Sequence, residues 1–171
     1  MNFNCIGYHG TPYKNVDAIQ RNGYQFSDEH QWFGAGVYFF GTMLPLSDGI
    51  EEAKKWVLFV KKESEWAVFK STIETNEYFD CVNNSDDRAF FDKLRKELFA
   101  LHIKSGRKVE HFKDRVVFKE LEKKQSFIVV RALVDATKKS YFNYVISHPQ
   151  IQICVKDLIA ITDNELIASG K

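Results

Sequence analysis

The sequence has few cysteines, little net charge and no long hydrophobic run. Its three cysteines, Cys5, Cys81 and Cys154, are widely spaced and form no Cys-x-x-Cys pair, so we expect neither a disulfide framework nor a metal site. The net charge is +1, which favours no particular class of charged partner. The longest apolar runs, at 56–60 and 127–130, are far too short to cross a bilayer. Because no leader segment with a basic start and an apolar centre is visible, we expect a cytoplasmic protein without a membrane partner.

Length and composition favour one compact domain of the α+β class. A chain of 171 residues, 44% hydrophobic and 15% aromatic, can bury a substantial core. We expect the domain to cover residues 1–163 and a short C-terminal tail to cover 164–171. Hydrophobic periodicity predicts helices at about 12–22, 48–60 and 86–104, with a weaker one at 108–121. It predicts strands at 3–8, 37–40, 66–74, 126–133 and 151–161.

The most informative stretch is Gly34-Ala35-Gly36, which leads directly into the predicted strand Val37–Phe40. Glycine has no Cβ, so the backbone can press closely against a ligand here, and an aromatic strand beside it suits a flat ligand. A tight turn into an ordinary core strand is the alternative interpretation. A dinucleotide-binding turn of the Rossmann type is not indicated, because that motif opens a helix rather than a strand.

A second motif, His9-Gly10-Thr11, ends the first predicted strand. Together the two motifs resemble the catalytic domain of the poly(ADP-ribose) polymerases and their diphtheria-toxin-like relatives. In that family a strand ends in His-Gly-Ser/Thr and the chain returns as Gly-x-Gly-(Ile/Val)-Tyr-Phe. The resemblance covers roughly the first sixty residues and one C-terminal strand. It implies an α+β fold with an ADP-ribosyltransferase-like split β-sheet core, an NAD cleft between two small sheets, and helices packed outside.

The resemblance also implies an activity and a set of NAD-binding residues. ADP-ribose would pass from NAD, the substrate, to a macromolecular acceptor, protein or nucleic acid, with release of nicotinamide. His9 would bond a hydroxyl of the adenosine-side ribose, while the Gly10 backbone and the Thr11 hydroxyl would hold the carboxamide. Tyr38 and Trp56 would stack on the nicotinamide. The alternative interpretations are that His9 is an ordinary histidine at the end of a strand and that Trp56 packs in the core. The expected NAD-binding residues are His9, Gly10, Thr11, Gly36, Tyr38, Phe39 and Trp56.

The sequence departs from the family at the residue that stabilises the positive charge developing on the reacting ribose. The family's last strand usually begins with a Glu that grips the reacting ribose, and the matching position here is Gln152. Together with His9 and Tyr38, Gln152 is a candidate catalytic residue. Losing the charge could cost about 3–4 kcal/mol, or roughly 10²–10³ in rate. In the family this change implies transfer of a single ADP-ribose, and Asp28 or Glu29 are the carboxylates that could substitute.

Two other functions remain open at this point. One is a catalytically inactive module that binds NAD or ADP-ribose, and the other is an enzyme similar to the RNA 2′-phosphotransferases. The latter would need a cluster of Arg near the cleft, whereas the first sixty residues contain only Arg21. A compact domain of this kind would suit a bacterial or phage toxin or defence effector, with an antitoxin or regulatory partner.

One stretch of the chain is strongly basic. Residues 93–124 hold eleven Lys and Arg against five Asp and Glu. A solvated helical face is one interpretation, and a surface that binds a nucleic-acid acceptor is the other.

Overall fold

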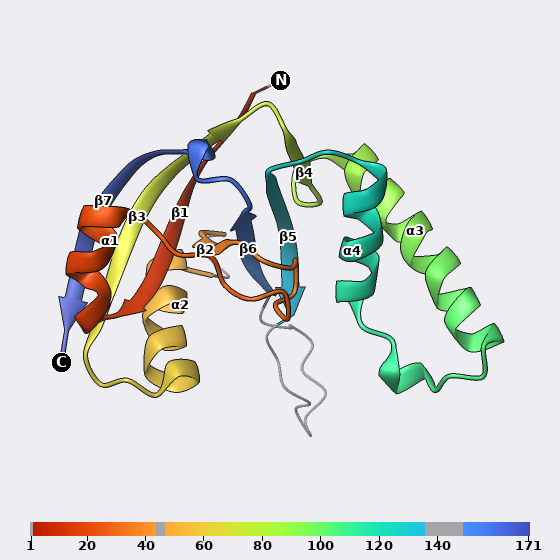
Figure 1. The fold of residues 1–171 in the computed structure, drawn as a ribbon, viewed down its shortest axis with the longest axis horizontal. Helices are drawn as coiled ribbons and strands as arrows, with labels where there is room; N and C mark the ends of the chain where they lie inside the picture. The colour runs from red at the N-terminus through yellow and green to blue at the C-terminus, as the bar shows by residue number, and fades with distance from the viewer. Residues whose placement is uncertain (1, 44–46, 136–148) are drawn as a thin grey trace.

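The computed structural model describes residues 2–43, 47–135 and 149–171 (Figure 1). Over these residues the chain is of the α+β class, with one seven-stranded mixed sheet and four α-helices. The strands are β1 (Phe3–Pro12), β2 (Val37–Gly41), β3 (Trp66–Thr75), β4 (Tyr78–Asp80), β5 (Val129–Asp135), β6 (Pro149–Val155) and β7 (Ile161–Gly170). The helices are α1 (Val16–Asn22), α2 (Gly49–Lys55), α3 (Ser85–Lys104) and α4 (Asp114–Lys124). Single helical turns are η1 (Tyr13–Asn15), η2 (Trp56–Lys61, a π-helical turn), η3 (Val109–His111) and η4 (Leu158–Ala160).

The sheet has the strand order β4-β5-β6-β2-β1-β3-β7 and is antiparallel except for the β4–β5 pair. β1 pairs with β3 along its whole length, from Phe3↔Thr75 to Pro12↔Trp66. By contrast, among the described residues β1 pairs with β2 at one position, Tyr8↔Phe40. The structure therefore has one continuous sheet where we expected two small ones. Its two parts, β4-β5-β6-β2 and β1-β3-β7, meet at a junction one residue pair long.

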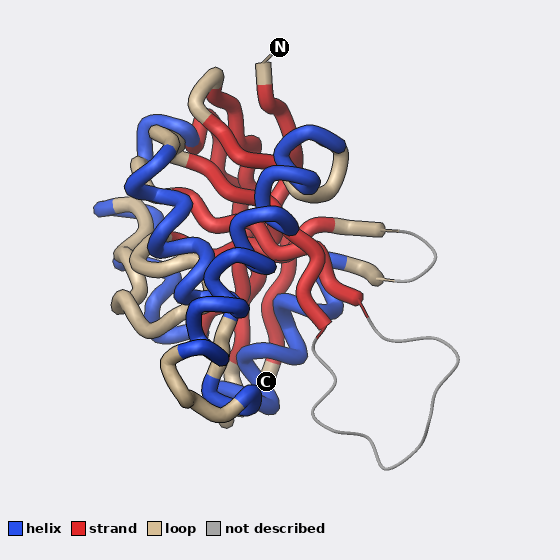
Figure 2. Tube along the Cα trace, turned by 90° about the vertical axis from the view of Figure 1, so that its right-hand side faces the viewer, coloured by secondary structure: helices blue, strands red, loops and turns tan. Residues whose placement is uncertain are grey.

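Two hydrophobic cores cover the two faces of the sheet. The first core lies under α1 and includes Val16, Ile19, Phe39 and Phe69. The second core lies under α3 and α4 and includes Leu94, Leu121 and Cys154 among its buried residues. α3 and α4 lie side by side beyond the β4–β5 end of the sheet, α1 lies toward its other end, and α2 packs on β1 and β2 in the middle (Figure 1). Figure 2 shows the strands passing through the middle of the molecule between helices.

The first strand is longer than the sequence predicts. The predicted strand ends at residue 8, yet β1 continues to Pro12 because β3 supplies a pairing partner for every residue of β1, as far as the pair Pro12↔Trp66. His9-Gly10-Thr11 consequently lies inside a strand rather than at the start of a helix. α1 begins only at Val16 and has no side-chain cap.

The predicted tail is wrong. Residues 164–170 belong to β7, which pairs with β3, and the pair Phe69↔Leu166 lies within this ladder. Leu166 is half-buried and packs against the first core, which explains why the segment is ordered as a strand. The predicted strand at 151–161 is interrupted, because β6 ends at Val155 and the Asp157 side chain accepts a hydrogen bond from the Ile159 amide to start η4.

The helices among the described residues are too short or too polar to span a membrane. The longest of them, α3, carries several charged side chains on its exposed surface.

Candidate functional site

The predicted catalytic residues come from three distant segments and lie on three adjacent strands. His9 is on β1, Tyr38 on β2 and Gln152 on β6, in the middle of the strand order. The register runs Tyr8↔Phe40 and Phe40↔Gln152, so these strands are aligned at the junction between the two parts of the sheet. Tyr38 lies two residues from Phe40, which puts the Tyr38 and Gln152 side chains on the same face of the sheet. The His9 side chain, one residue after Tyr8, points to the opposite face, where it packs against Tyr24 and Phe39. The fold therefore aligns the strands that carry the two motifs and Gln152, with the His9 side chain on the other face of the sheet from those of Tyr38 and Gln152.

His9 is held in one orientation by the neighbouring strand. Its Nδ1 lies 2.8 Å from the carbonyl oxygen of Tyr38. Because a carbonyl only accepts, Nδ1 is the donor, and the neutral ring keeps Nε2 as an acceptor. Burial is the main cause that lowers the pKa of His9; the bond to Tyr38 opposes the shift and Lys61 adds to it. The rings of Tyr24 and Phe39 pack edge-on at 4.9 and 5.7 Å. The ring of His9 is thus fixed in orientation, and the lowered pKa favours its neutral form.

Tyr38 closes the glycine-containing turn that precedes its own strand. Its hydroxyl accepts a hydrogen bond from the Phe33 amide and donates one to the Gly34 carbonyl, both at 2.8 Å. Its ring is parallel to that of Phe33, at 5.8 Å and 6°. Burial is the main cause that raises the pKa of Tyr38, which stays a neutral phenol. One face of the ring is therefore covered by Phe33, and the side chain as a whole remains half-buried.

Lys156 fixes the same turn to β6 and α4. Its ammonium group donates to the Phe33 carbonyl at 2.5 Å and pairs with Glu122 of α4 at 2.5 Å. The Lys156 side chain is only 16% exposed, so this contact is largely shielded from solvent. The turn at Phe33 and Gly34 is therefore held by Tyr38 of β2, by Lys156 directly after β6 and, through Lys156, by Glu122 of α4.

Close packing explains why two positions of the motifs are glycine, since a Cβ there would collide with neighbouring atoms. A Cβ on Gly10 would lie 2.1 Å from the carbonyl oxygen of Ala53, so the glycine lets α2 sit directly on β1. A Cβ on Gly36 would lie 2.5 Å from the Cys154 sulfur and 2.8 Å from the Val155 oxygen of β6. Both glycines are required by the fold itself, and their predicted contacts with NAD stay predictions.

The other predicted NAD-binding residues lie in different surroundings. Thr11 is 3% exposed, and its hydroxyl accepts a hydrogen bond from the Asn15 amide at 3.2 Å. Phe39 is 1% exposed and belongs to the first core, where its ring packs against that of His9, and its predicted contact with NAD stays a prediction. Trp56 is half-buried in η2, where the Lys61 ammonium lies 4.8 Å from its ring centre. The aromatic contacts among the described residues do not join Trp56 to Tyr38.

Sequence reasoning missed a carboxylate that the structure brings to this region. Glu52 of α2 accepts a hydrogen bond from the Gln150 side-chain amide, which ties α2 to β6. Gln150 and Gln152 lie on the same face of β6, since side chains alternate along a strand. The two expected substitutes, Asp28 and Glu29, are instead exposed in the loop before Phe33. The periodicity of α2 indicates its apolar side but not which of its glutamates reaches β6.

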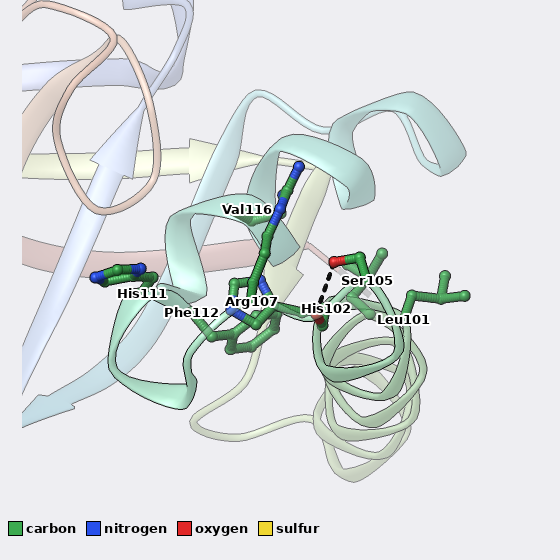
Figure 3. A pocket seen from close by; sticks show the side chains of 8 residues that line it. Leu101, His102, Ser105, Arg107, His111, Phe112 and Val116 are labelled. Carbon is green, nitrogen blue, oxygen red and sulfur yellow. Dashed lines mark hydrogen bonds between the residues drawn. The ribbon is translucent and has the colours of Figure 1, made fainter.

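A groove elsewhere on the molecule is separate from this site (Figure 3). It has a volume of about 340 Å³ and lies between the end of α3, η3 and the start of α4. Its floor is largely apolar, and it coincides with the basic stretch at 93–124. The lining residues are Leu98, Leu101, His102, Ser105, Arg107, His111, Phe112 and Val116.

Within the described ranges, no three His, Cys, Asp or Glu side chains are grouped so that they could hold a metal ion. A comparison with models of protein families found no match. A comparison with curated proteins also found no similar sequence.

Proposed function

We propose that this protein is an NAD-dependent mono-ADP-ribosyltransferase, which moves ADP-ribose from NAD to a macromolecular acceptor and releases nicotinamide. The observation that supports the proposal is that the strands carrying His9, Tyr38 and Gln152 are adjacent and aligned at the junction of the sheet, where Nδ1 of His9 bonds the carbonyl of Tyr38. In this proposal the two parts of the sheet form an ADP-ribosyltransferase-like core, and NAD binds where β1 and β2 diverge beyond Tyr8↔Phe40.

The proposed reaction breaks the bond between C1′ of the ribose and the nicotinamide nitrogen. The bonding electron pair goes to the ring nitrogen, which becomes neutral, and positive charge develops at C1′ as in glycoside hydrolysis. A nucleophile of the acceptor then bonds C1′ and loses its proton. His9 accepts, at Nε2, a hydrogen bond from a hydroxyl of the adenosine-side ribose, and Tyr38 stacks on the nicotinamide. The side-chain amide oxygen of Gln152 accepts a hydrogen bond from a hydroxyl of the reacting ribose.

The remaining parts of the proposal concern partners and setting. Gly10 and Thr11 hold the carboxamide, and Trp56 supplies a second ring. The acceptor is a protein or a nucleic acid, and the basic stretch at 93–124 favours the latter. A cytoplasmic toxin or defence effector of a bacterium or phage, with an antitoxin or regulatory partner, would fit this activity.

A second candidate function is a module that binds NAD or ADP-ribose without catalysis. The observation that favours it is the uncharged side chain of Gln152, at the place where the proposed reaction needs negative charge. Nicotinamide release separates the two functions, because binding alone liberates none.

The proposal is tested by calorimetric titration with NAD. Replacement of Tyr38 by Ala removes one stacking ring and should weaken binding by about 1–3 kcal/mol, as for stacked bases. Tyr13→Ala is the matched control, because Tyr13 is 47% exposed on η1 and lies outside the proposed site. Equal affinity of the wild type and Tyr38→Ala would show that Tyr38 does not stack on NAD. Absence of NAD binding by the wild type would reject the transferase and an NAD-binding module, and titration with ADP-ribose would then test the remaining form of the second candidate.

A further inference from the structure

We propose that Glu52 supplies the negative charge that Gln152 cannot, and that it stabilises the cation developing at C1′ of the reacting ribose. This inference rests on the proposed function. Breaking the glycosidic bond of NAD moves positive charge from the ring to the ribose, and a carboxylate nearby lowers the barrier. Gln152 can orient the ribose but carries no charge, so the site needs a carboxylate from another element.

Glu52 differs from its neighbour on the same helix. The Glu52 side chain is 16% exposed, whereas that of Glu51 is 52% exposed and lies 3.8 Å from the Lys54 ammonium. One carboxylate oxygen of Glu52 accepts a hydrogen bond from the Gln150 amide, and the other pairs with Lys55 at 3.0 Å. Both oxygens are thus fixed in place, which is how a charged group is preorganised.

The helix that carries Glu52 is itself locked over the junction of the sheet. Gly10 of β1 lies directly beneath the carbonyl of Ala53, and the ring of Tyr8 lies against Gly49. Tyr8 pairs with Phe40, which in turn pairs with Gln152. The start of α2 therefore lies against Tyr8 and Phe40, in the same row of paired residues as Gln152, so the position of Glu52 is set by packing.

The separation along β6 is short enough for the charge to act. Gln150, which binds Glu52, precedes Gln152 by two residues on the same face, or about 7 Å along the strand. At an effective dielectric constant near 20, a full charge at that distance changes an equilibrium or a rate by about 10- to 100-fold. Lys55 opposes this effect, but it is 54% exposed and more strongly screened by solvent.

In this account Glu52 forms no covalent bond. The electron pair of the broken C1′–N bond leaves with nicotinamide, and the new bond to C1′ comes from the acceptor's nucleophile, whose proton passes to solvent. Gln150 is a positioning residue, because it acts on the reaction only through the carboxylate of Glu52.

The experiment compares Glu52→Gln with Glu51→Gln in an assay of nicotinamide release from NAD. A glutamine at 52 can still accept the hydrogen bond from Gln150 through its amide oxygen, so the change removes charge and preserves the tether between α2 and β6. We expect kcat to fall about 10- to 100-fold in Glu52→Gln, with KM and thermal stability close to those of the wild type. Glu51→Gln should match the wild type, and Glu52→Asp should retain more activity than Glu52→Gln.

The outcomes separate this inference from the proposed function. Nicotinamide release by the wild type that is unchanged in Glu52→Gln would overturn the inference alone. A wild type that releases no nicotinamide would overturn the proposed function, and this inference with it. If Glu52→Gln does not fold, Glu52→Asp and Glu52→Asn make a second pair that differs in charge at equal length. Equal kcat for that pair would also overturn the inference.

Discussion

Removal of the Tyr38 hydroxyl should destabilise the protein without removing the ring proposed to stack on NAD. In the structure this hydroxyl accepts from the amide of Phe33 and donates to the carbonyl of Gly34, each at 2.8 Å. Phe33 is 1% exposed, so its amide would lose a partner in surroundings that admit little water. Tyr38→Phe keeps the ring and its parallel contact with Phe33 and deletes these two hydrogen bonds.

The size of the effect follows from the cost of unpaired buried polar groups. A buried donor or acceptor left without its partner costs about 1–3 kcal/mol. For a protein of this length, each 1 kcal/mol corresponds to roughly 2–4 °C in the unfolding midpoint. We therefore expect the midpoint of Tyr38→Phe to fall by about 2–12 °C.

Thermal unfolding followed by circular dichroism measures this shift, and Tyr13→Phe serves as the control. Tyr13 is 47% exposed, so loss of its hydroxyl should leave the midpoint unchanged. If Tyr38→Phe and Tyr13→Phe unfold at the same temperature, the hydroxyl does not hold the turn. NAD affinity measured on the same samples should be retained in Tyr38→Phe, because the ring is still present.

Three further predictions concern packing, charge and pH. Gly10→Ala should lower the free energy of unfolding by at least about 1–3 kcal/mol, since a Cβ would lie 2.1 Å from the Ala53 oxygen; an unchanged denaturation curve would contradict this. Stability should decline as pH falls below about 6.5, because the lowered pKa of His9 means that the unfolded chain takes up its proton first. His9→Gln should flatten this decline, and an identical pH profile would refute the assignment. RNA should bind at low salt with an affinity that falls steeply as the salt concentration rises, and the double variant Arg107→Glu, Lys108→Glu should reduce this dependence on salt. Binding that is absent, or that does not change with salt, would show that the basic stretch at 93–124 is not a nucleic-acid surface.

Much of the fold could be predicted from local patterns. The sequence predicts a strand at 37–40 and a helix at 86–104, and the structure has β2 at Val37–Gly41 and α3 at Ser85–Lys104. Both have clear local signals: an aromatic run after glycine, and an Asn84 side chain that accepts hydrogen bonds from the amides of Asp86 and Asp87.

The errors arise where pairing between distant strands overrides local signals. β1 extends to Pro12 and β7 covers 164–170 because both pair with β3, whose residues lie 54 to 104 positions away in the sequence, from Pro12↔Trp66 to Trp66↔Gly170. The three-residue strand β4 is too short to give a periodic signal and exists through its pairing with β5.

In the candidate site, too, local patterns identify individual residues, while contacts between distant segments cannot be predicted. The sequence singles out His9, Tyr38 and Gln152, because two motifs and a strand can be recognised locally. It cannot show that His9 bonds the carbonyl of Tyr38, or that Glu52 is tied to β6, because both depend on how β1, β2, α2 and β6 assemble.

Nicotinamide release from NAD tests the central claim most directly. Purified wild-type protein is incubated with NAD labelled in its adenosine half and with a cell extract, and free nicotinamide is measured alongside label bound to macromolecules after protease or nuclease treatment. We predict that the wild type releases nicotinamide and transfers single ADP-ribose units, and that Gln152→Ala loses most turnover while remaining folded. NAD that binds without nicotinamide release would instead support the binding module, and Gln152→Glu would then be the variant to restore hydrolysis. Release that is equally fast in Gln152→Ala would contradict the role assigned to this residue.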